Sequence, residues 1–255
     1  MKYLFLIITI VTIIFTSAVS IPGSPYLINN MTQADISNMF PSAITPAPIT
    51  FSIWSLIYLS WIMVGIFLMG FSLPGPIKNL FPQNWHFSKY KKTPKNIILC
   101  FCAVVMLTGI WLLPWGYLMI GTSLLVMIII LGILKYIFQN SRDLHPIIRS
   151  SIELTLGWIN IAMVANTTIW LLSIGFQGGN IPEIYWVIGV LGLALGLTIY
   201  YQQKYQAYII SLVYLWTLLG VWIAHPSYEQ RFTVVILGIA TLISIVISYF
   251  NKKKK

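Results

Sequence analysis

The chain has 255 residues, of which 58% are hydrophobic and only 8% are charged, and its mean hydropathy is +0.85. Because an ordinary soluble domain carries about 25% charged residues, this composition excludes a soluble globular protein and indicates a polytopic membrane protein. The net charge of +10 does not indicate a nucleic-acid partner, since the basic residues lie in short loops beside apolar segments, where they set membrane topology.

Eight apolar segments predict an all-α integral membrane protein with eight transmembrane helices. Each segment is close to the ~20 residues that a span requires. They cover about residues 3–20, 50–71, 96–113, 115–138, 151–174, 184–201, 207–224 and 232–250. The third and fourth segments run together, and Pro114 is the only strong helix breaker between them. The sequence therefore predicts a tight hairpin that breaks at Pro114.

Positive charges are concentrated in alternate loops. Fourteen of the fifteen Lys and Arg residues lie on one side of the predicted spans, and only Arg231 lies on the other. Because short loops rich in Lys and Arg face the cytoplasm, this pattern predicts that both termini are cytoplasmic. We take a bacterial inner membrane as the default location.

The first apolar segment has two interpretations. Lys2, a short apolar run and the sequence Ala18-Val19-Ser20 are typical of a signal peptide with its cleavage site. Cleavage would leave seven spans and an outer N-terminus, whereas the uncleaved segment is the first of eight spans. The charge pattern is compatible with both.

Aromatic residues dominate one face of the second segment. Trp54, Tyr58, Trp61 and Gly65 lie on the same face of a helix at 100° per residue. Such a surface can stack on a flat ligand, or it can pack against another helix. The loop before this face contains three prolines: Pro41, Pro46 and Pro48. A loop stiffened in this way can cover a cavity or can be a simple ordered connector.

The fifth segment contains the most informative pattern of the chain. Trp158, Ala162, Asn166 and Trp170 follow one another every four residues, which on a helix makes one stripe with a slow drift. An Asn side chain facing lipid would leave its amide unpaired, so the stripe is expected to face protein or a ligand. It predicts either a pocket for a flat apolar ligand or a helix–helix contact.

A second polar stripe lies on the opposite face of the fifth segment. Glu153, Gly157 and Asn160 form it, and Arg149 lies one turn before Glu153 as a salt-bridge partner. A proton-coupled role for Glu153 is the alternative to this structural salt bridge. Because neither face suits lipid, we expect the last three segments to cover the side of Glu153 and Asn160.

Small and sulfur-containing residues give weaker signals. Cys100 and Cys102 point to different faces of one apolar segment, which favours buried thiols over a disulfide or a metal pair. Gly192 and Gly196 in the sixth segment form a small-xxx-small pair, which permits close helix contact and a homodimer. No cluster of His, Cys, Asp and Glu has the spacing of a metal site, so none is predicted.

Two motifs resemble a known family. The second segment begins with the pattern Phe-x-x-Trp-x-x-Ile-Tyr, from Phe51 to Tyr58, and the stripe that includes Trp158 and Asn166 has the spacing of the fifth helix in that family. Together they resemble the TspO/MBR family, the tryptophan-rich sensory proteins related to the mitochondrial translocator protein. The third segment departs from the family pattern, because Thr108 stands where an Asn is usual, three residues before Trp111.

The resemblance implies a domain organisation. Residues 1–175 look like the complete five-helix TspO-like bundle, and residues 176–255 would add three transmembrane helices and a lysine tail. This length suggests the TspO/MBR-related branch of the family. A complete five-helix unit favours the uncleaved first helix over the signal peptide.

The resemblance also implies a function. Family members are linked to the binding, transport and sensing of tetrapyrroles or sterols in a cavity near the first loop, with no required cofactor. The expected ligand contacts in this chain are Trp54, Tyr58, Trp61, Trp111, Trp158, Ala162 and Asn166. An enzyme that degrades porphyrins by photo-oxidation and a membrane scaffold without a small ligand are the alternatives.

Overall fold

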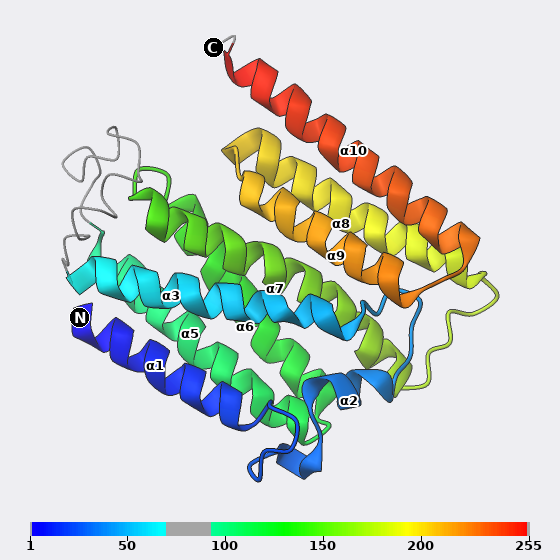
Figure 1. The fold of residues 1–255 in the computed structure, drawn as a ribbon, viewed down its shortest axis with the longest axis horizontal. Coiled ribbons are helices and arrows are strands. Elements are labelled where there is room, and N and C mark those ends of the chain that lie inside the picture. Colours follow the sequence, from blue (N-terminus) through cyan, green and yellow to red (C-terminus); the bar gives the residue numbers. More distant parts are fainter. Residues whose placement is uncertain (1, 70–92, 254–255) are drawn as a thin grey trace.

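The computed structural model describes residues 2–69 and 93–253, and within these ranges every regular element is a helix (Figure 1). The predicted all-α fold is thus confirmed for this part of the chain. The longer helices are α1 (Lys2–Ala18), α3 (Ile53–Met69), α5 (Lys95–Gly116), α6 (Ile120–Gln139), α7 (Pro146–Ser173), α8 (Glu183–Tyr205), α9 (Tyr208–Ala224) and α10 (Tyr228–Lys253). Three short helices lie between α1 and α3: η1 (Ile28–Asn30), α2 (Gln33–Asn38) and η2 (Pro48–Ser52). Most of the predicted lysine-rich loop after α3 lies outside the described residues.

The chain is an integral membrane protein. Six helices in the described ranges are long and apolar enough to cross a membrane. They are Pro48–Met69, Lys95–Gly116, Ile120–Gln139, Pro146–Ser173, Glu183–Tyr205 and Tyr228–Phe250. The remaining two predicted spans, α1 and α9, are apolar but shorter, at 17 residues each.

The longer helices form two groups that pack side by side (Figure 1). In the five-helix group, α1 lies against α3 and α5, and α6 lies against α5 and α7. The three-helix group consists of α8, α9 and α10, and its main contact with the first group is α9 along α7. α10 packs on α8 and α9. The start of α1 and the end of α10 both lie at the left-hand ends of these helices in Figure 1, while α2 and its flanking loops lie at the bottom of the view.

Helix α1 is a packed member of the five-helix group. Phe5 is fully buried, and its ring centroid lies 5.2 Å from that of Phe101 on α5. On α3, Gly65 allows close approach, because a Cβ atom there would lie 2.8 Å from Cδ1 of Leu6. The segment that resembles a signal peptide therefore supplies core contacts to two neighbouring helices.

Pro114 does not break the chain where the sequence predicted. α5 continues through Pro114 and ends at Gly116. A proline so close to the end of a helix costs one backbone hydrogen bond, which the last turn tolerates. The reversal occurs at Leu118, whose φ of 58° is left-handed, and the Met119 N–H donates to the Pro114 carbonyl at 2.8 Å.

The polar stripe of α7 is covered as predicted, and within the three-helix group α8 and α9 are the helices that pack against α7. Gly157 packs directly on α9, since a Cβ atom there would lie 3.2 Å from Cβ of Val213. Asn160 lies in the seam between α7 and α8, beside Thr198. The small-residue pair on α8 behaves differently: a Cβ atom on Gly192 or Gly196 would have no neighbour within 4 Å, so this pair packs on no helix of the described chain.

Candidate ligand cavity

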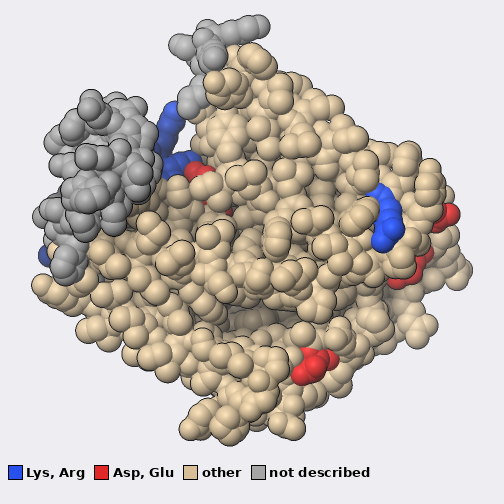
Figure 2. Space-filling model, viewed as in Figure 1, with Lys and Arg blue, Asp and Glu red and all other residues tan. Residues whose placement is uncertain are grey.

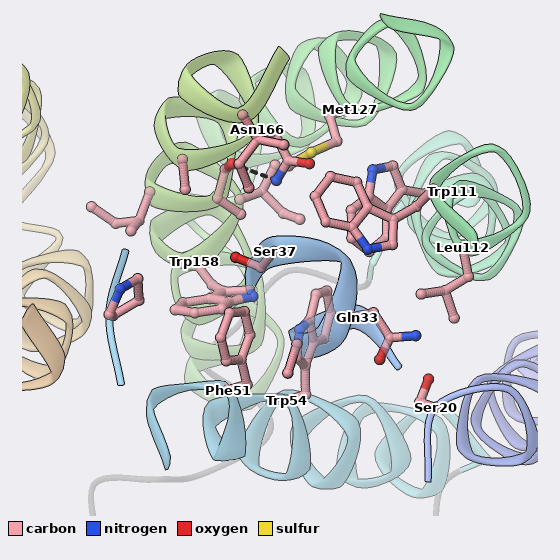
Figure 3. A pocket seen from close by; sticks show the side chains of 18 of the residues that line it. Ser20, Gln33, Ser37, Phe51, Trp54, Trp111, Leu112, Met127, Trp158 and Asn166 are labelled. Atoms are coloured by element: carbon pink, nitrogen blue, oxygen red, sulfur yellow. Dashed lines mark hydrogen bonds between the residues drawn. The ribbon is translucent and has the colours of Figure 1, made fainter. Parts of the chain in front are cut away.

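A cavity of about 450 Å³ lies where the two helix groups meet the segment that contains α2 and η2, and we call it the central cavity. Its walls come from α1, α3, α5, α6 and α7, and also from α8 and α9. On the face drawn in Figure 2, a hollow lies between the regions of α3 and α2. The segment 32–37 contributes Thr32, Gln33 and Ser37 to the wall, and Figure 3 shows Gln33 and Ser37 beside the aromatic side chains.

Two aromatic clusters line the central cavity (Figure 3). On α3 and α7, the Trp54 and Trp158 rings meet edge to face at a centroid distance of 6.2 Å, and Phe51 meets Trp158 in the same way at 6.0 Å. On α5, Trp111 and Trp115 stack at 5.3 Å with an interplanar angle of 27°. Aromatic faces in such numbers favour a flat apolar ligand.

Asn166 carries the central polar group of the wall. Its Nδ2 atom donates to the Ala162 carbonyl one turn back, at 2.8 Å. Its Oδ1 atom is buried and accepts no hydrogen bond from the described residues, and only 6% of the residue's surface is exposed. A buried acceptor without a partner costs about 1–3 kcal/mol, which a suitable ligand group could recover.

Three indole nitrogens on the walls of the central cavity likewise have no hydrogen-bond partner among the described residues. Nε1 of Trp111, Trp115 and Trp158 is buried and donates to no atom of the described chain. Indole N–H groups in a protein interior usually find an acceptor. The central cavity therefore combines apolar faces with three unused donors and one unused acceptor, all of them covered in this conformation.

The structure brings six of the seven predicted contact residues to the central cavity. They are Trp54, Tyr58, Trp111, Trp158, Ala162 and Asn166. The seventh, Trp61, does not line it. Trp61 is fully buried one turn deeper on α3, and its Nε1 donates to Oγ1 of Thr155 at 3.0 Å. It lies on the predicted face, but below the floor of the cavity.

Trp170, the last member of the α7 stripe, also does not line the central cavity. The stripe drifts by about 40° every four residues, because four residues turn a helix by more than one full turn. Over the 12 residues from Trp158 to Trp170 the drift reaches about 120°. Trp170 consequently faces α6, where its Nε1 would lie 3.2 Å from a Cβ atom at Gly121.

The three-helix group contributes wall residues that the sequence did not predict. Leu191 and Ala194 of α8 and Thr217 of α9 line the central cavity. No motif distinguishes these residues from other apolar or small residues of a span. For the covering loop, in contrast, the sequence did give a signal in its prolines. Pro46 and Pro48 line the cavity, as expected of a loop that covers it.

Three hydrogen bonds attach that loop to the three-helix group, and we call these three bonds the loop clamp. Two of them are made by residues of α9 and the third by the residue that follows α9. The Trp216 indole N–H donates to the Thr50 carbonyl at 2.9 Å, and the Ala47 N–H donates to the Gly220 carbonyl at 2.9 Å. The third bond joins Nε2 of His225 to the Thr45 carbonyl, also at 2.9 Å. The loop over the cavity is therefore attached to the three-helix group.

Charge is absent from the lining of the central cavity, which among the described residues contains no Asp, Glu, Lys, Arg or His. The nearest acid along the chain is Asp35, an exposed residue of α2 between lining residues Ala34 and Ser37. The Asp35 carboxylate accepts hydrogen bonds from the backbone N–H and the hydroxyl of Thr32, at 2.8 and 2.7 Å, and these bonds hold its pKa below the ordinary value. The described residues contain no group of His, Cys, Asp and Glu that could hold a metal ion.

Fold and cavity together define the class of protein: an all-helical integral membrane protein with an apolar, aromatic-walled cavity. The family model described as TSPO-like protein matches residues 5–251, so the chain belongs to the TSPO-like family. The family resemblance drawn from Phe51–Tyr58 and from the α7 stripe is confirmed. No curated protein and no solved structure matches this chain.

Proposed function

We propose that this protein binds a flat apolar ligand in the central cavity, a tetrapyrrole or a sterol, in order to transport or sense it. The observation that carries the proposal is the set of unused polar atoms on largely apolar walls: the Asn166 amide oxygen and three indole N–H groups. A cavity of about 450 Å³ falls within the roughly 300–1,000 Å³ of small-molecule pockets.

The proposed topology has eight membrane crossings with both termini in the cytoplasm of a bacterial cell. α1 and α9, at 17 residues each, are at the lower limit of about 17 residues for a spanning helix. The core contacts of α1 support an uncleaved first helix. An even number of crossings agrees with the two chain ends on one side of the bundle in Figure 1.

A titration with protoporphyrin IX tests the proposal. The purified protein in detergent is titrated while the Soret band is followed, alongside Trp158→Ala, Asn166→Ala and the control Trp222→Ala. Trp222 lies outside the cavity, with Arg231 over its ring. We expect saturable binding by the wild type and the control, and its loss in the two cavity variants while they remain folded. Binding that is equal in all four proteins would contradict the proposal.

The same proteins separate the two alternatives. A scaffold without a small ligand requires interlocking aromatic stripes and predicts that Asn166→Ala changes stability only; the open space between the aromatic clusters argues against it. A porphyrin-degrading enzyme would form product from bound porphyrin under light, which absorbance spectra of the reaction would reveal.

A further inference from the structure

We infer that the central cavity selects an uncharged ligand and disfavours a flat molecule that carries free carboxylates. This inference rests on the proposed function and narrows its ligand class. Among tetrapyrroles it favours those without ionised acid groups, and it favours a neutral polycyclic lipid over a dicarboxylate porphyrin.

The wall chemistry gives the first argument. Every polar side chain on the described wall is neutral: hydroxyls, the two amides of Gln33 and Asn166, and indole N–H groups. Neutral donors satisfy a carbonyl or ether oxygen fully, whereas a carboxylate taken out of water also requires a compensating cation. The described wall of the cavity provides hydrogen-bond donors for such oxygens but no cation to pair with a carboxylate.

Two arginines of the described chain, Arg149 and Arg231, are engaged elsewhere. The Arg149 guanidinium bonds Glu153 at 2.8 Å and the Tyr205 carbonyl at 3.1 Å, and it lies over the Phe138 ring. Arg231 stacks over an exposed tryptophan. His225 is not a wall residue, and its Nε2 is engaged with the Thr45 carbonyl.

The mouth of the cavity adds the second argument. The segment from 21 to 49, which supplies the covering loop and α2, contains one charged residue, Asp35. Its carboxylate is bound to Thr32, a wall residue, and the lowered pKa keeps it ionised at neutral pH. Figure 2 shows an acidic side chain at the edge of the hollow, with the basic side chains farther away. An anion therefore meets a like charge before it enters.

A matched pair of probes tests the inference. Protoporphyrin IX and its dimethyl ester share one macrocycle, but at neutral pH only the free acid carries two carboxylates. The Kd of each is measured with the full chain in lipid nanodiscs, and only the binding that Trp158→Ala abolishes is counted, which removes partition into lipid. Because the desolvation of an unpaired charge exceeds the free energy of a tenfold change, we expect the ester to bind at least about tenfold more tightly.

Two charge variants at the mouth sharpen the test. Asp35→Lys is expected to tighten binding of the free acid and to leave the ester unchanged, with Asp35→Asn intermediate. The ester also reports whether each variant retains an intact cavity. If Asp35→Lys also weakened binding of the ester, the affinities of the two porphyrins would be compared in Asp35→Asn instead, because Asn can still accept the Thr32 hydrogen bonds.

The outcomes separate this inference from the proposed function. Equal affinities, or tighter binding of the free acid by the wild type, would overturn the selection of a neutral ligand and leave ligand binding in place. Failure of both porphyrins would also overturn it, because the uncharged ester would then be excluded as well, whereas saturable, Trp158-dependent binding of cholesterol would leave the proposed function in place. Failure of all three probes would overturn the proposed function, and the inference with it.

Discussion

Trp61 and Trp158, which the sequence places on inward faces, differ in whether the indole N–H has a hydrogen-bond partner. The Trp61 N–H donates to Thr155 in the packed core, and Thr155 in turn donates to the Ser151 carbonyl at 2.8 Å. The Trp158 N–H has no partner among the described residues and lies on the wall of the central cavity. The first residue therefore joins α3 to α7, and the second leaves a buried donor unused on the cavity wall.

Substitution by Phe should separate these two roles. Trp61→Phe removes the hydrogen bond to Thr155 and is expected to lower the free energy of unfolding by about 1–3 kcal/mol without changing ligand affinity. Trp158→Phe is expected to weaken ligand binding and to leave stability nearly unchanged, because its N–H has no partner in the described chain to lose. Thermal unfolding in detergent and a ligand titration check the pair. A reversed result would mean that the site extends below the cavity floor.

The capping box of α2 should respond to pH. Because the folded-state pKa of Asp35 is lowered by its Thr32 hydrogen bonds, the contact stabilises α2 above the unfolded pKa of about 3.9. That stabilisation is lost as the pH falls through the folded pKa. We expect protection of residues 33–38 against hydrogen exchange to fall below about pH 4, relative to α5. The Thr32→Ala protein serves as the control, since it should lack this pH dependence.

At the residue level, periodicity predicted the face of a side chain but not its depth. Trp54 and Trp61 lie on one face of α3, as the 100° rule requires, yet only Trp54 reaches the cavity. Depth depends on where neighbouring helices end and where loops cover them. A single-helix pattern contains no information about either.

At the level of elements, the contact between α9 and the covering loop depends on one glycine. A Cβ atom on Gly220 would collide with Oγ1 of Thr50 and would lie 3.0 Å from Cβ of Pro46. Both loop residues belong to the segment fixed by the loop clamp. The absence of a side chain at Gly220 therefore sets how closely the loop approaches α9.

Gly220→Ala is expected to push the loop away from α9, to destabilise the protein by about 1–3 kcal/mol and to weaken ligand binding. The matched control is Gly196→Ala on α8, where a Cβ atom has no neighbour within 4 Å. Unfolding and ligand titrations on both variants provide the measurement. If Gly220→Ala bound ligand like the control, the position of the loop would not govern the cavity.

The sequence predicted where the helices lie in the chain better than it predicted the residues at which they begin and end. Pro114 suggested a break between the third and fourth segments, but the chain reverses at Leu118. Proline is tolerated in a last helical turn, and Leu rarely adopts a positive φ, so neither residue identified the turn. Helix α7 begins at Pro146, earlier than the predicted start near residue 151, because the neutral ring of His145 accepts the Ile147 N–H and Pro146 is a favourable first residue. Burial, which lowers the pKa of His145, favours that neutral form.

At the scale of the whole molecule, an ion pair joins the two helix groups. Arg149 and Glu153 of α7 bond at 2.8 Å with side chains only 16% and 7% exposed, and Arg149 also donates to the Tyr205 carbonyl at the end of α8. The Glu153 carboxylate also lies close to the backbone N–H of Ile209 at the start of α9. The predicted salt bridge is confirmed, and it connects α7 to the turn between α8 and α9.

Removal of one partner of the Arg149–Glu153 ion pair should destabilise the protein more than removal of both partners. Arg149→Met leaves a buried carboxylate unpaired and is expected to cost about 3–5 kcal/mol of unfolding free energy. The double variant Arg149→Met with Glu153→Leu is expected to recover most of that loss, since an apolar pair of similar volume replaces the charges. Thermal unfolding of the two variants checks the order. A double variant as unstable as the single one would argue for a role of Glu153 beyond the ion pair.

Composition and two motifs predicted the class of protein and its family, but not that both helix groups build one cavity. Each motif belongs to one helix or one loop, and both come from the five-helix part. Leu191, Ala194 and Thr217 reach the wall only through the packing of α8 and α9 on α7. Such contacts between distant segments leave no periodic signal in a single sequence.

A cavity whose walls come from both helix groups has a practical consequence for handling this protein. An occupant that touches α3, α7 and α9 together binds only the assembled state, so by mass action its presence raises the resistance of the whole fold to detergent and heat. At a free concentration of about 100 times Kd the gain is about 2.7 kcal/mol. Solubilisation in the presence of different candidate compounds, scored by the surviving monodisperse fraction, would therefore rank ligands before any of them has been identified biochemically.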